Sequence, residues 1–259
     1  MFVPDGYRKS CSDWMMKTTG LNLLISDKPD LERDSVANSF ASRGGTVHRI
    51  GRFWDPPVFD PRTVRVYGAD SFCLVLQQKL GLTLCSPDDE LLLDVPSESL
   101  NRQIARHMLG GASAITFPSF VKPVVPKQFR GAVYQSSREL VAECRGLSSN
   151  TAIFVSEPVA LLAEARTFVI DGRVLDAAVY QGKAEAVGAS TFVNALTRAM
   201  SLPRAVVVDV GLIDSRGWAV IEFNAAWGAG LNGCDPERVL PAIVAASGPR
   251  CDSELPAEM

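Results

Sequence analysis

Two apolar runs near the carboxyl end of the chain, residues 206–211 and 218–224, constrain its fold more than any other feature. A polar turn, Asp-Ser-Arg-Gly, lies between them, so they are predicted to be the two strands of a hairpin. Asp209 lies in the first strand, and Glu222 and Asn224 lie two residues apart in the second. Because alternate residues of a strand point to the same side, Glu222 and Asn224 share a face, and Asp209 is expected to stand near it.

Acidic side chains inside apolar strands need a physical explanation. A buried carboxylate without a partner is strongly unfavourable, so Asp209 and Glu222 beside Asn224 predict either protonation or a bound cation. From this stretch alone the alternative stays open that the hairpin is half-exposed and both acids point to solvent. Oxygen donors of this kind suit Mg²⁺, which does not require imidazole.

Composition excludes several other kinds of chemistry. The two histidines, His48 and His107, lie in no catalytic or metal-binding motif, so zinc hydrolysis and Ser-His-Asp catalysis are poorly supported. No two of the six cysteines form a CxxC pair, and we expect reduced thiols in a cytoplasmic protein. A net charge of −3 provides no basic field for nucleic acid. The N-terminus does not resemble a signal peptide and no apolar run reaches about 18 residues, so no membrane association is expected.

Hydrophobic periodicity divides the 259 residues into two parts. Residues 21–96 alternate strand-like and helix-like segments and predict a small α/β layer with parallel strands. Residues 97–247 predict an α+β part built of paired strands and helices. Residues 1–20 and 248–259 are expected to be tails.

The expected elements follow from period, turn residues and β-branched content. Strands are expected at residues 21–26, 47–50, 64–67, 114–116, 120–123, 132–135, 153–158, 166–170, 174–180, 206–211 and 218–224. Helices are expected at residues 31–42, 72–80, 97–108, 137–144, 191–200 and 236–246. Asp171 and Gly172 give the strongest two-residue hairpin signal in the chain.

An acid followed thirteen positions later by Glu-x-Asn is the metal-binding pattern of the ATP-grasp superfamily, and Asp209, Glu222 and Asn224 match it. The chain therefore resembles an ATP-grasp protein, a superfamily typified by D-alanine-D-alanine ligase. The resemblance implies two α+β subdomains that clasp ATP, preceded by a small α/β pre-grasp domain over residues 21–96. It also implies ATP and Mg²⁺ as cofactors, with Mg²⁺ on these three residues.

Two further segments agree with this resemblance. Lys122, in Phe-Val-Lys-Pro, looks like the family's strand lysine that reaches the α- and β-phosphates, and residues 153–159 resemble the interdomain hinge whose backbone pairs with the adenine edge. Glu157 falls where an acid commonly accepts from the adenine amino side, and Glu164 falls where an acid commonly holds the ribose hydroxyls. The residues implied for the nucleotide are Lys122, Val155, Ser156, Glu157, Val159 and Glu164.

Each of these residues also has a simpler explanation. Lys122 could be a charge at a strand edge, and Glu157 could end a strand before a proline. Glu164 could merely pair with Arg166 or with solvent.

Two departures from the family pattern concern the phosphates. Many relatives have a glycine-rich flap after the lysine strand, whereas residues 124–133 hold only Gly131. Val207 stands where several ligases place an arginine, so the transition-state cation of a ligase must come from elsewhere.

Arg166 and Lys183 are the candidates for that cation. Arg166 lies in an apolar strand, where a guanidinium needs anionic partners. A phosphate with its attacking carboxylate would supply them, or Arg166 would pair with Glu157 or Glu164 and hold the hinge. Lys183 is ambiguous between a solvated loop and a phosphate contact.

A glycine motif, Gly228-x-Gly-x-x-Gly233, matches the dinucleotide-binding fingerprint in letters. Alone it is weak, and the 26 residues after Gly233 are too few for the helix, strand and acid that a Rossmann unit needs. In an ATP-grasp protein this loop would offer backbone N–H groups near the γ-phosphate and the acceptor, with Asn232 contributing.

The resemblance implies ATP-dependent ligation of a carboxylate to an amine or a similar nucleophile through an acyl phosphate. Glu-x-Arg beside a Ser-Glu-Pro-Val hinge looks most like a clade of small ATP-grasp proteins. Small-molecule or peptide carboxylates and amines are the expected partners, and the oligomeric state is open, a homodimer included. The alternatives are a nucleotide-binding sensor or scaffold without turnover, and a grasp-fold kinase.

Overall fold

The computed structural model describes residues 17–249. They form two compact units, one of residues 17–84 with 247–249 and the other of residues 85–246. Thr18 belongs to the first unit, where its hydroxyl is buried and donates to the Phe40 carbonyl oxygen. These limits differ from the predicted 21–96 and 97–247, and the assignment of the parts to a pre-grasp and an ATP-grasp domain stays a prediction.

The first unit contains the predicted layer of parallel strands. Its three-stranded sheet has the order β2-β1-β3, with both neighbours parallel to β1. The elements are β1 (Asn22–Ser26), α1 (Leu31–Ser42), β2 (Thr46–Ile50), η2 (Pro61–Thr63), β3 (Val64–Val66), α2 (Asp70–Leu80) and β4 (Leu82–Leu84). The chain returns at its end to pair β13 (Ser247–Pro249) with β4, two short strands that the sequence did not predict.

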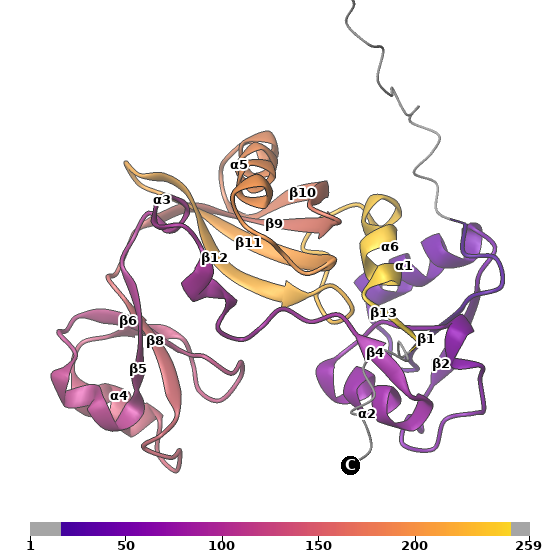
Figure 1. Ribbon diagram of the computed structural model, residues 1–259, viewed down its shortest axis with the longest axis horizontal. Helices are drawn as coiled ribbons and strands as arrows, with labels where there is room; N and C mark the ends of the chain where they lie inside the picture. Colours follow the sequence, from indigo (N-terminus) through magenta and orange to yellow (C-terminus); the bar gives the residue numbers. More distant parts are fainter. Residues whose placement is uncertain (1–16, 250–259) are drawn as a thin grey trace, which may run out of the picture. The chain divides into compact units, whose positions relative to one another are not determined.

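The second unit contains two antiparallel four-stranded sheets (Figure 1). The first sheet has the order β5-β8-β6-β7, with α4 packed against it. Its elements are β5 (Ile104–Met108), η4 (Leu109–Ala114), β6 (Ser119–Pro123), β7 (Ala132–Tyr134), α4 (Ser137–Glu143) and β8 (Ala152–Ser156). The two short helices that precede them, η3 (Leu91–Asp94) and α3 (Ser97–Leu100), contribute side chains to the core of the second sheet instead. The core between sheet and helix is formed by side chains such as Val121, Tyr134 and Leu140.

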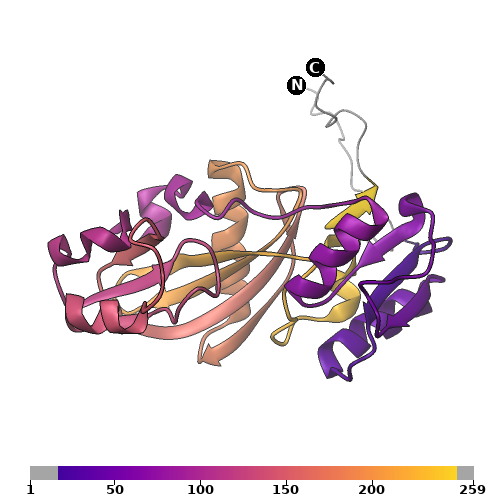
Figure 2. The same ribbon diagram turned by 90° about the horizontal axis from the view of Figure 1, so that it is seen from below.

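The second sheet has the order β10-β9-β11-β12. Its elements are β9 (Leu161–Ile170), β10 (Arg173–Gly182), α5 (Ala186–Ala199), β11 (Ala205–Ile213), β12 (Gly217–Ala225) and α6 (Pro236–Ala245). Helix α5 covers one face of this sheet (Figures 1 and 2), where its Val193 and Leu196 pack in one core with Val206 and Val208 of β11. Both predicted hairpins are present, and Asp171 and Gly172 adopt the positive φ angles, 46° and 72°, that a tight β-turn requires.

Two predictions for residues 97–116 were wrong. The helix expected at residues 97–108 ends at Leu100, because Asn101 takes a left-handed conformation (φ 50°) that stops it. Residues 104–108 instead form β5, the edge strand of the sheet, which pairs with β8. The strand expected at residues 114–116 is absent, because the chain there leaves the short helix η4 and Ile115 packs into the core.

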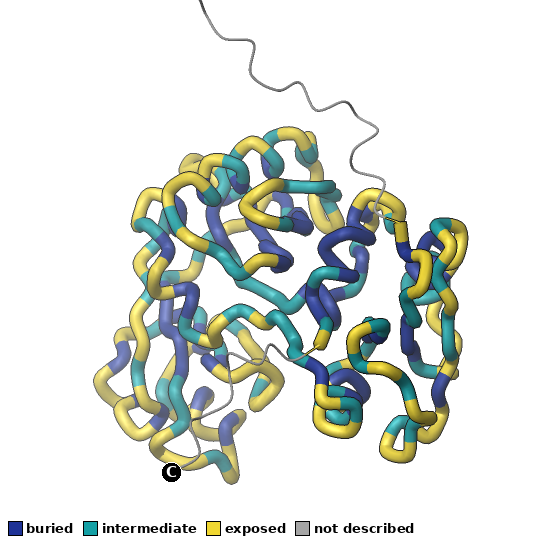
Figure 3. The backbone as a smooth tube through the Cα atoms, turned by 45° about the vertical axis from the view of Figure 1, so that its right-hand side comes forward, coloured by how far each residue is buried: buried dark blue, intermediate teal, exposed yellow. Residues whose placement is uncertain are grey.

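Buried residues concentrate in the strands and helices of each unit, and exposed ones in the connections (Figure 3). The four described cysteines, Cys73, Cys85, Cys144 and Cys234, are free thiols. Within residues 17–249, no helix has the length and apolar character needed to cross a bilayer.

Candidate functional site

One face of the β9–β12 sheet carries a row of charged side chains. In the strand register, Arg166 of β9 lies opposite Asp209 of β11, and Asp209 lies opposite Glu222 of β12. Residues that alternate with Asp209, such as Val208 and Val210, belong to the apolar core beneath α5. The period of two therefore separates a packed apolar face from a polar face that carries the site.

Arg166 and Asp209 form a nearly buried, bidentate ion pair. Arg166 Nε donates to Asp209 Oδ1 at 2.8 Å and Nη2 donates to Oδ2 at 2.6 Å. The side chains are only 11% and 3% exposed, so this is a charge-assisted pair in a weakly solvated setting. Burial raises the pKa of Asp209, against the opposing effect of the Arg166 hydrogen bonds. Burial is the largest single effect on Arg166 and lowers its pKa, but the hydrogen bonds and the charge of Asp209, together with the charges of Tyr180 and Glu222, outweigh it, so that the pKa is raised overall.

Asn224 joins the two carboxylates that the sequence analysis predicted to converge. Its Nδ2 donates to Asp209 Oδ2 at 3.1 Å and to Glu222 Oε1 at 3.2 Å. Lys122, on β6 of the other sheet, completes the cluster because its Nζ donates to Glu222 Oε2 at 3.2 Å. Burial raises the pKa of Glu222, but the charge and hydrogen bond of Lys122, the Asn224 hydrogen bond and the charge of Arg166 together outweigh it and hold the pKa below its usual value.

The donor set of this cluster fits a hard divalent cation. The side-chain amide of Asn224 bridges two carboxylates, because its Nδ2 atom lies within hydrogen-bond distance of both Asp209 and Glu222. Carboxylate and amide oxygens are the ligands that Mg²⁺ prefers, and a rotation of the amide by half a turn presents its oxygen in place of its nitrogen. Asp209, Glu222 and Asn224 are therefore the residues that could hold Mg²⁺.

Glu164 and Tyr180 extend the polar face toward the end of β10. Glu164 lies two residues before Arg166 on β9, and it accepts a hydrogen bond of 3.0 Å from Tyr180 Oη. The β9–β10 register shifts between Val179 and Gln181, so Tyr180 is the extra residue of a bulge. Bulges re-aim side chains at functional sites. Burial, together with the charges of Asp209 and Glu164, raises the pKa of Tyr180 and keeps the phenol a hydrogen-bond donor.

The hinge predicted at residues 153–159 overlaps the end of β8, and only residues 157–159 follow the strand. The carboxylate of Glu157 there is bound by Arg216, a partner that was not predicted. Arg216, in the β11–β12 turn, donates from Nη1 to Glu157 Oε1 at 2.8 Å and from Nη2 to Oε2 at 3.1 Å. This contact lowers the pKa of Glu157. The alternative in which Arg166 pairs with Glu157 or Glu164 was wrong, because Glu157 pairs with Arg216 and Glu164 accepts from Tyr180. The anionic partner of Arg166 is Asp209.

The other hinge residues differ in what they can offer a ligand. Val155 is buried in the core beneath the first sheet, and its backbone lies in the ladder between β5 and β6. Ser156 is also buried, and its hydroxyl donates to the Glu157 carbonyl oxygen at 3.4 Å. Val159 is half-buried in the connection between β8 and β9.

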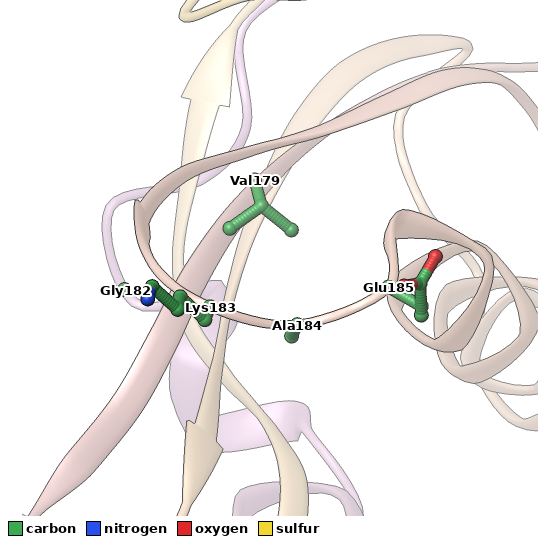
Figure 4. Close-up of a pocket in the computed structure, with 5 residues that line it drawn as sticks. All are labelled: Val179, Gly182, Lys183, Ala184 and Glu185. Carbon is green, nitrogen blue, oxygen red and sulfur yellow. The ribbon is translucent and has the colours of Figure 1, made fainter.

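Lys183 lies on the exposed turn between β10 and α5, apart from the hydrogen bonds around Asp209. It lines a shallow, open hollow with Val179, Gly182, Ala184 and Glu185 (Figure 4). Gly182 adopts a positive φ of 75° where the chain leaves β10, and a side chain there would collide with the Leu162 carbonyl oxygen. The structure therefore brings Arg166 into the cluster and leaves Lys183 at its periphery.

Two glycine-containing loops border the cluster. The loop with the Gly228-to-Gly233 motif follows β12, an antiparallel edge strand, which excludes a Rossmann unit. Its Gly230 carbonyl oxygen accepts a hydrogen bond of 2.8 Å from Arg166 Nη1. In the segment after β6, a Cβ on Gly131 would lie 3.1 Å from Lys122 Cβ, so the missing side chain allows the two backbones to approach closely.

Comparison with known proteins agrees with this geometry. The family described as ATP-grasp domain, R₂K clade family 2, matches residues 100–242, more than half of the chain. No curated protein matches the chain in sequence.

Three solved structures illustrate the similarity of the fold. A RimK domain ATP-grasp protein from Sphaerobacter thermophilus DSM 20745 is 14% identical, with a TM-score of 0.61 over 86% of this chain and 99% of its own. D-cycloserine synthetase DcsG is 16% identical, with a TM-score of 0.58 over 87% and 98%. The ATP-grasp ligase PsnB, complexed with precursor peptide PsnA2 and AMPPNP, is 15% identical, with a TM-score of 0.52 over 89% and 98%.

Proposed function

Because the chain belongs to this second family of the R₂K clade of ATP-grasp domains and has the ATP-grasp fold, we propose that it is an ATP-dependent ligase that joins a carboxylate to an amine or a similar nucleophile. The observation that carries this proposal is the convergence of Lys122 from one sheet with Arg166, Asp209, Glu222 and Asn224 from the other. A charged set of this kind, between two sheets, suits a polyphosphate with its metal ion. A solved neighbour, PsnB, is an ATP-grasp ligase that holds AMPPNP and a peptide, which supports a peptide or small-molecule carboxylate as substrate.

Asp209, Glu222 and Asn224 are the residues we assign to Mg²⁺, which supplies charge neutralisation for phosphoryl transfer when bound. Lys122 Nζ lies 3.2 Å from Glu222 Oε2, and we propose that the same ammonium group contacts an oxygen of the α- or β-phosphate and neutralises part of its charge. An oxygen of the substrate carboxylate attacks the γ-phosphorus, ADP leaves, and the amine then attacks the acyl carbon and releases phosphate. The chain's own residues act by positioning and electrostatics, so the reaction does not require histidine.

Arg166 has two proposed tasks. A guanidinium has five N–H donors, and Asp209 and the Gly230 carbonyl oxygen use three of them. Arg166 therefore orients Asp209 and keeps two donors for a phosphate oxygen or for the attacking carboxylate. Lys183 is the second candidate for the positive charge that stabilises the transition state. It ranks below Arg166 because its exposed turn would have to move toward the cluster.

The remaining assigned residues hold the nucleoside. We propose that Val155, Ser156, Glu157 and Val159 border the adenine edge, as in the family hinge, with Glu157 accepting from the adenine amino side. Glu164 is proposed to hold the ribose hydroxyls. Glu164 already accepts from Tyr180, so its carboxylate has a fixed orientation before any ligand binds.

Nucleotide binding and its products test the proposal. We expect ATP with Mg²⁺ to raise the melting temperature, because a ligand at about 100 times its dissociation constant adds about 2.7 kcal/mol of stability. No shift at millimolar nucleotide would contradict the assignment.

Product analysis then separates the three activities. A ligase releases ADP and phosphate only when a carboxylate and an amine are both supplied. A kinase releases ADP and transfers the phosphate, and a sensor binds ATP without forming ADP.

A further inference from the structure

The segment that connects the two sheets of the second unit is held in place by hydrogen bonds at both of its ends. Residues 157–160, here called the hinge, join β8 to β9, and each of these strands has a neighbour on both sides in its own sheet. The proposed backbone contacts with a bound purine depend on the conformation of this segment.

Both ends of the hinge are attached to the β11–β12 turn. At the first end, the Glu157 carboxylate accepts from both Nη atoms of Arg216, at 2.8 and 3.1 Å. At the second end, the Ala160 carbonyl oxygen accepts from the Asp214 backbone N–H at 3.0 Å. Glu157 Oε1 also accepts from the backbone N–H of Gln103 at 3.3 Å. The hinge is therefore fixed to the β9–β12 sheet through its side chain and its backbone.

The turn that carries Arg216 is itself well defined. Ser215 and Gly217 both have positive φ angles, 61° and 88°, which restrict the turn to a tight form. Arg216 Nη1 further donates to the Asn101 carbonyl oxygen at 3.1 Å, and Asn101 Nδ2 donates to the Trp218 carbonyl oxygen at 2.8 Å. The guanidinium therefore links the hinge, the turn and the segment that enters β5.

The ion pair contributes little to overall stability, which makes a geometric role the better explanation. The side chains of Arg216 and Glu157 are 44% and 39% exposed, and ion pairs that are this accessible to solvent add little free energy of unfolding. Three hydrogen bonds occupy most of the acceptor positions of the Glu157 carboxylate. The side chain is thus committed to Arg216, while the hinge backbone is held in one conformation.

We propose that Arg216 is a positioning residue for purine recognition: through Glu157 it sets the hinge backbone in the conformation that distinguishes an adenine edge from a guanine edge. This inference rests on the proposed nucleotide site. It adds to that proposal a residue outside the hinge that determines base selectivity. The physical reason is preorganisation, since a backbone already ordered loses less entropy when it binds the base.

The test compares two nucleotides on the full chain. Dissociation constants of Mg·ATP and Mg·GTP are measured by calorimetry for the wild type, Arg216→Gln and Arg216→Lys. We expect the wild type to bind ATP more tightly than GTP. In Arg216→Gln the ratio of the GTP to the ATP dissociation constant should fall about tenfold, an effect of the size of one or two hydrogen bonds, while the GTP dissociation constant stays nearly unchanged. Arg216→Lys should lose less, because it keeps the charge but not the two-pronged geometry.

A matched control is Arg204→Gln, which removes an exposed arginine paired with Asp171 at 3.4 Å in the β9–β10 hairpin region. It should leave both dissociation constants unchanged. Equal weakening of ATP and GTP binding in Arg216→Gln, or an unchanged preference, would overturn the inference while leaving the nucleotide site intact. A wild type that binds ATP and GTP equally would do the same, whereas a wild type that binds neither nucleotide would overturn the proposed function itself.

Discussion

Arg166 and Asp209 lie opposite each other on β9 and β11 and share two parallel hydrogen bonds, of 2.8 and 2.6 Å. The same carboxylate accepts from Asn224, so the proposed metal ligand is held between a guanidinium and an amide. Removing one partner of such a buried pair leaves the other uncompensated and costs about 3–5 kcal/mol. A test of either residue therefore needs a substitution that keeps the charge or the shape.

Arg166→Lys keeps the charge but cannot bond both Asp209 oxygens and the Gly230 carbonyl oxygen at once. We expect ADP release to fall by at least about tenfold, equivalent to about 1.4 kcal/mol of transition-state stabilisation, with ATP affinity changed only about threefold. ADP release and ATP binding measured on the same variant check this. Arg204→Lys, in an exposed pair, is the control.

Two other outcomes of that measurement assign Arg166 differently. If ATP affinity and melting temperature fall together with activity, Arg166 only maintains the architecture around Asp209. Unchanged ADP release would remove it from the proposed catalytic residues.

Glu222→Gln tests the metal assignment without breaking the fold. Glutamine conserves the shape and can still accept from Lys122 or Asn224, but it loses the charge that a divalent cation requires. We expect a melting temperature within a few degrees of the wild type and loss of Mg²⁺-dependent ATP turnover. The exposed Glu98, on α3, gives the control substitution Glu98→Gln. Full turnover in Glu222→Gln would show that this carboxylate is not a metal ligand.

Local patterning predicted the centre of the site because its determinants are local. A period of two and a polar turn predicted that Asp209, Glu222 and Asn224 lie near one face, and the spacing typical of the ATP-grasp family favoured a shared site over solvent-facing acids. The structure has all three in one hydrogen-bonded cluster. The pairing of Arg166 was not predictable in this way. It depends on the pairing of β9 with β11, two strands far apart in the sequence. The residue pattern within β9 does not indicate which strand lies beside it or in which register.

Elements and contacts that depend on backbone geometry or on distant residues were not predictable from the sequence. The predicted helix at residues 97–108 was ended by the left-handed Asn101 and replaced by pairing with β8. Tyr180 was missed because its direction comes from a bulge in β10, which a single sequence does not show. Arg216 was missed because its partner, Glu157, is 59 residues away.

The pKa of Glu222 predicts how acid affects the fold. Its pKa in the folded chain lies below the ordinary value of 4.5, so the unfolded chain binds the proton more readily. The stabilisation is therefore fully present above pH 4.5 and is lost as the pH falls through the folded pKa. We expect the free energy of unfolding to decrease more steeply below pH 4.5 in the wild type than in Glu222→Gln. Denaturant unfolding at several pH values measures this, and parallel curves would contradict it.

Tyr180→Phe removes a single hydroxyl and leaves the ring, so it isolates the hydrogen bond of 3.0 Å to Glu164. If Glu164 holds the ribose hydroxyls, losing the donor that orients it should weaken ATP binding about three- to tenfold, the range of one hydrogen bond. Binding of 2′,3′-dideoxy-ATP, which lacks the hydroxyls, should be nearly the same for the variant and the wild type. Because Tyr180 is 37% exposed, the melting temperature should change little. Calorimetric titration with both nucleotides measures the difference.

Equal losses of affinity for the two nucleotides would mean that Tyr180 supports the β10 bulge instead of the sugar contact. No loss of affinity for either nucleotide would contradict the proposal that Glu164 binds the ribose.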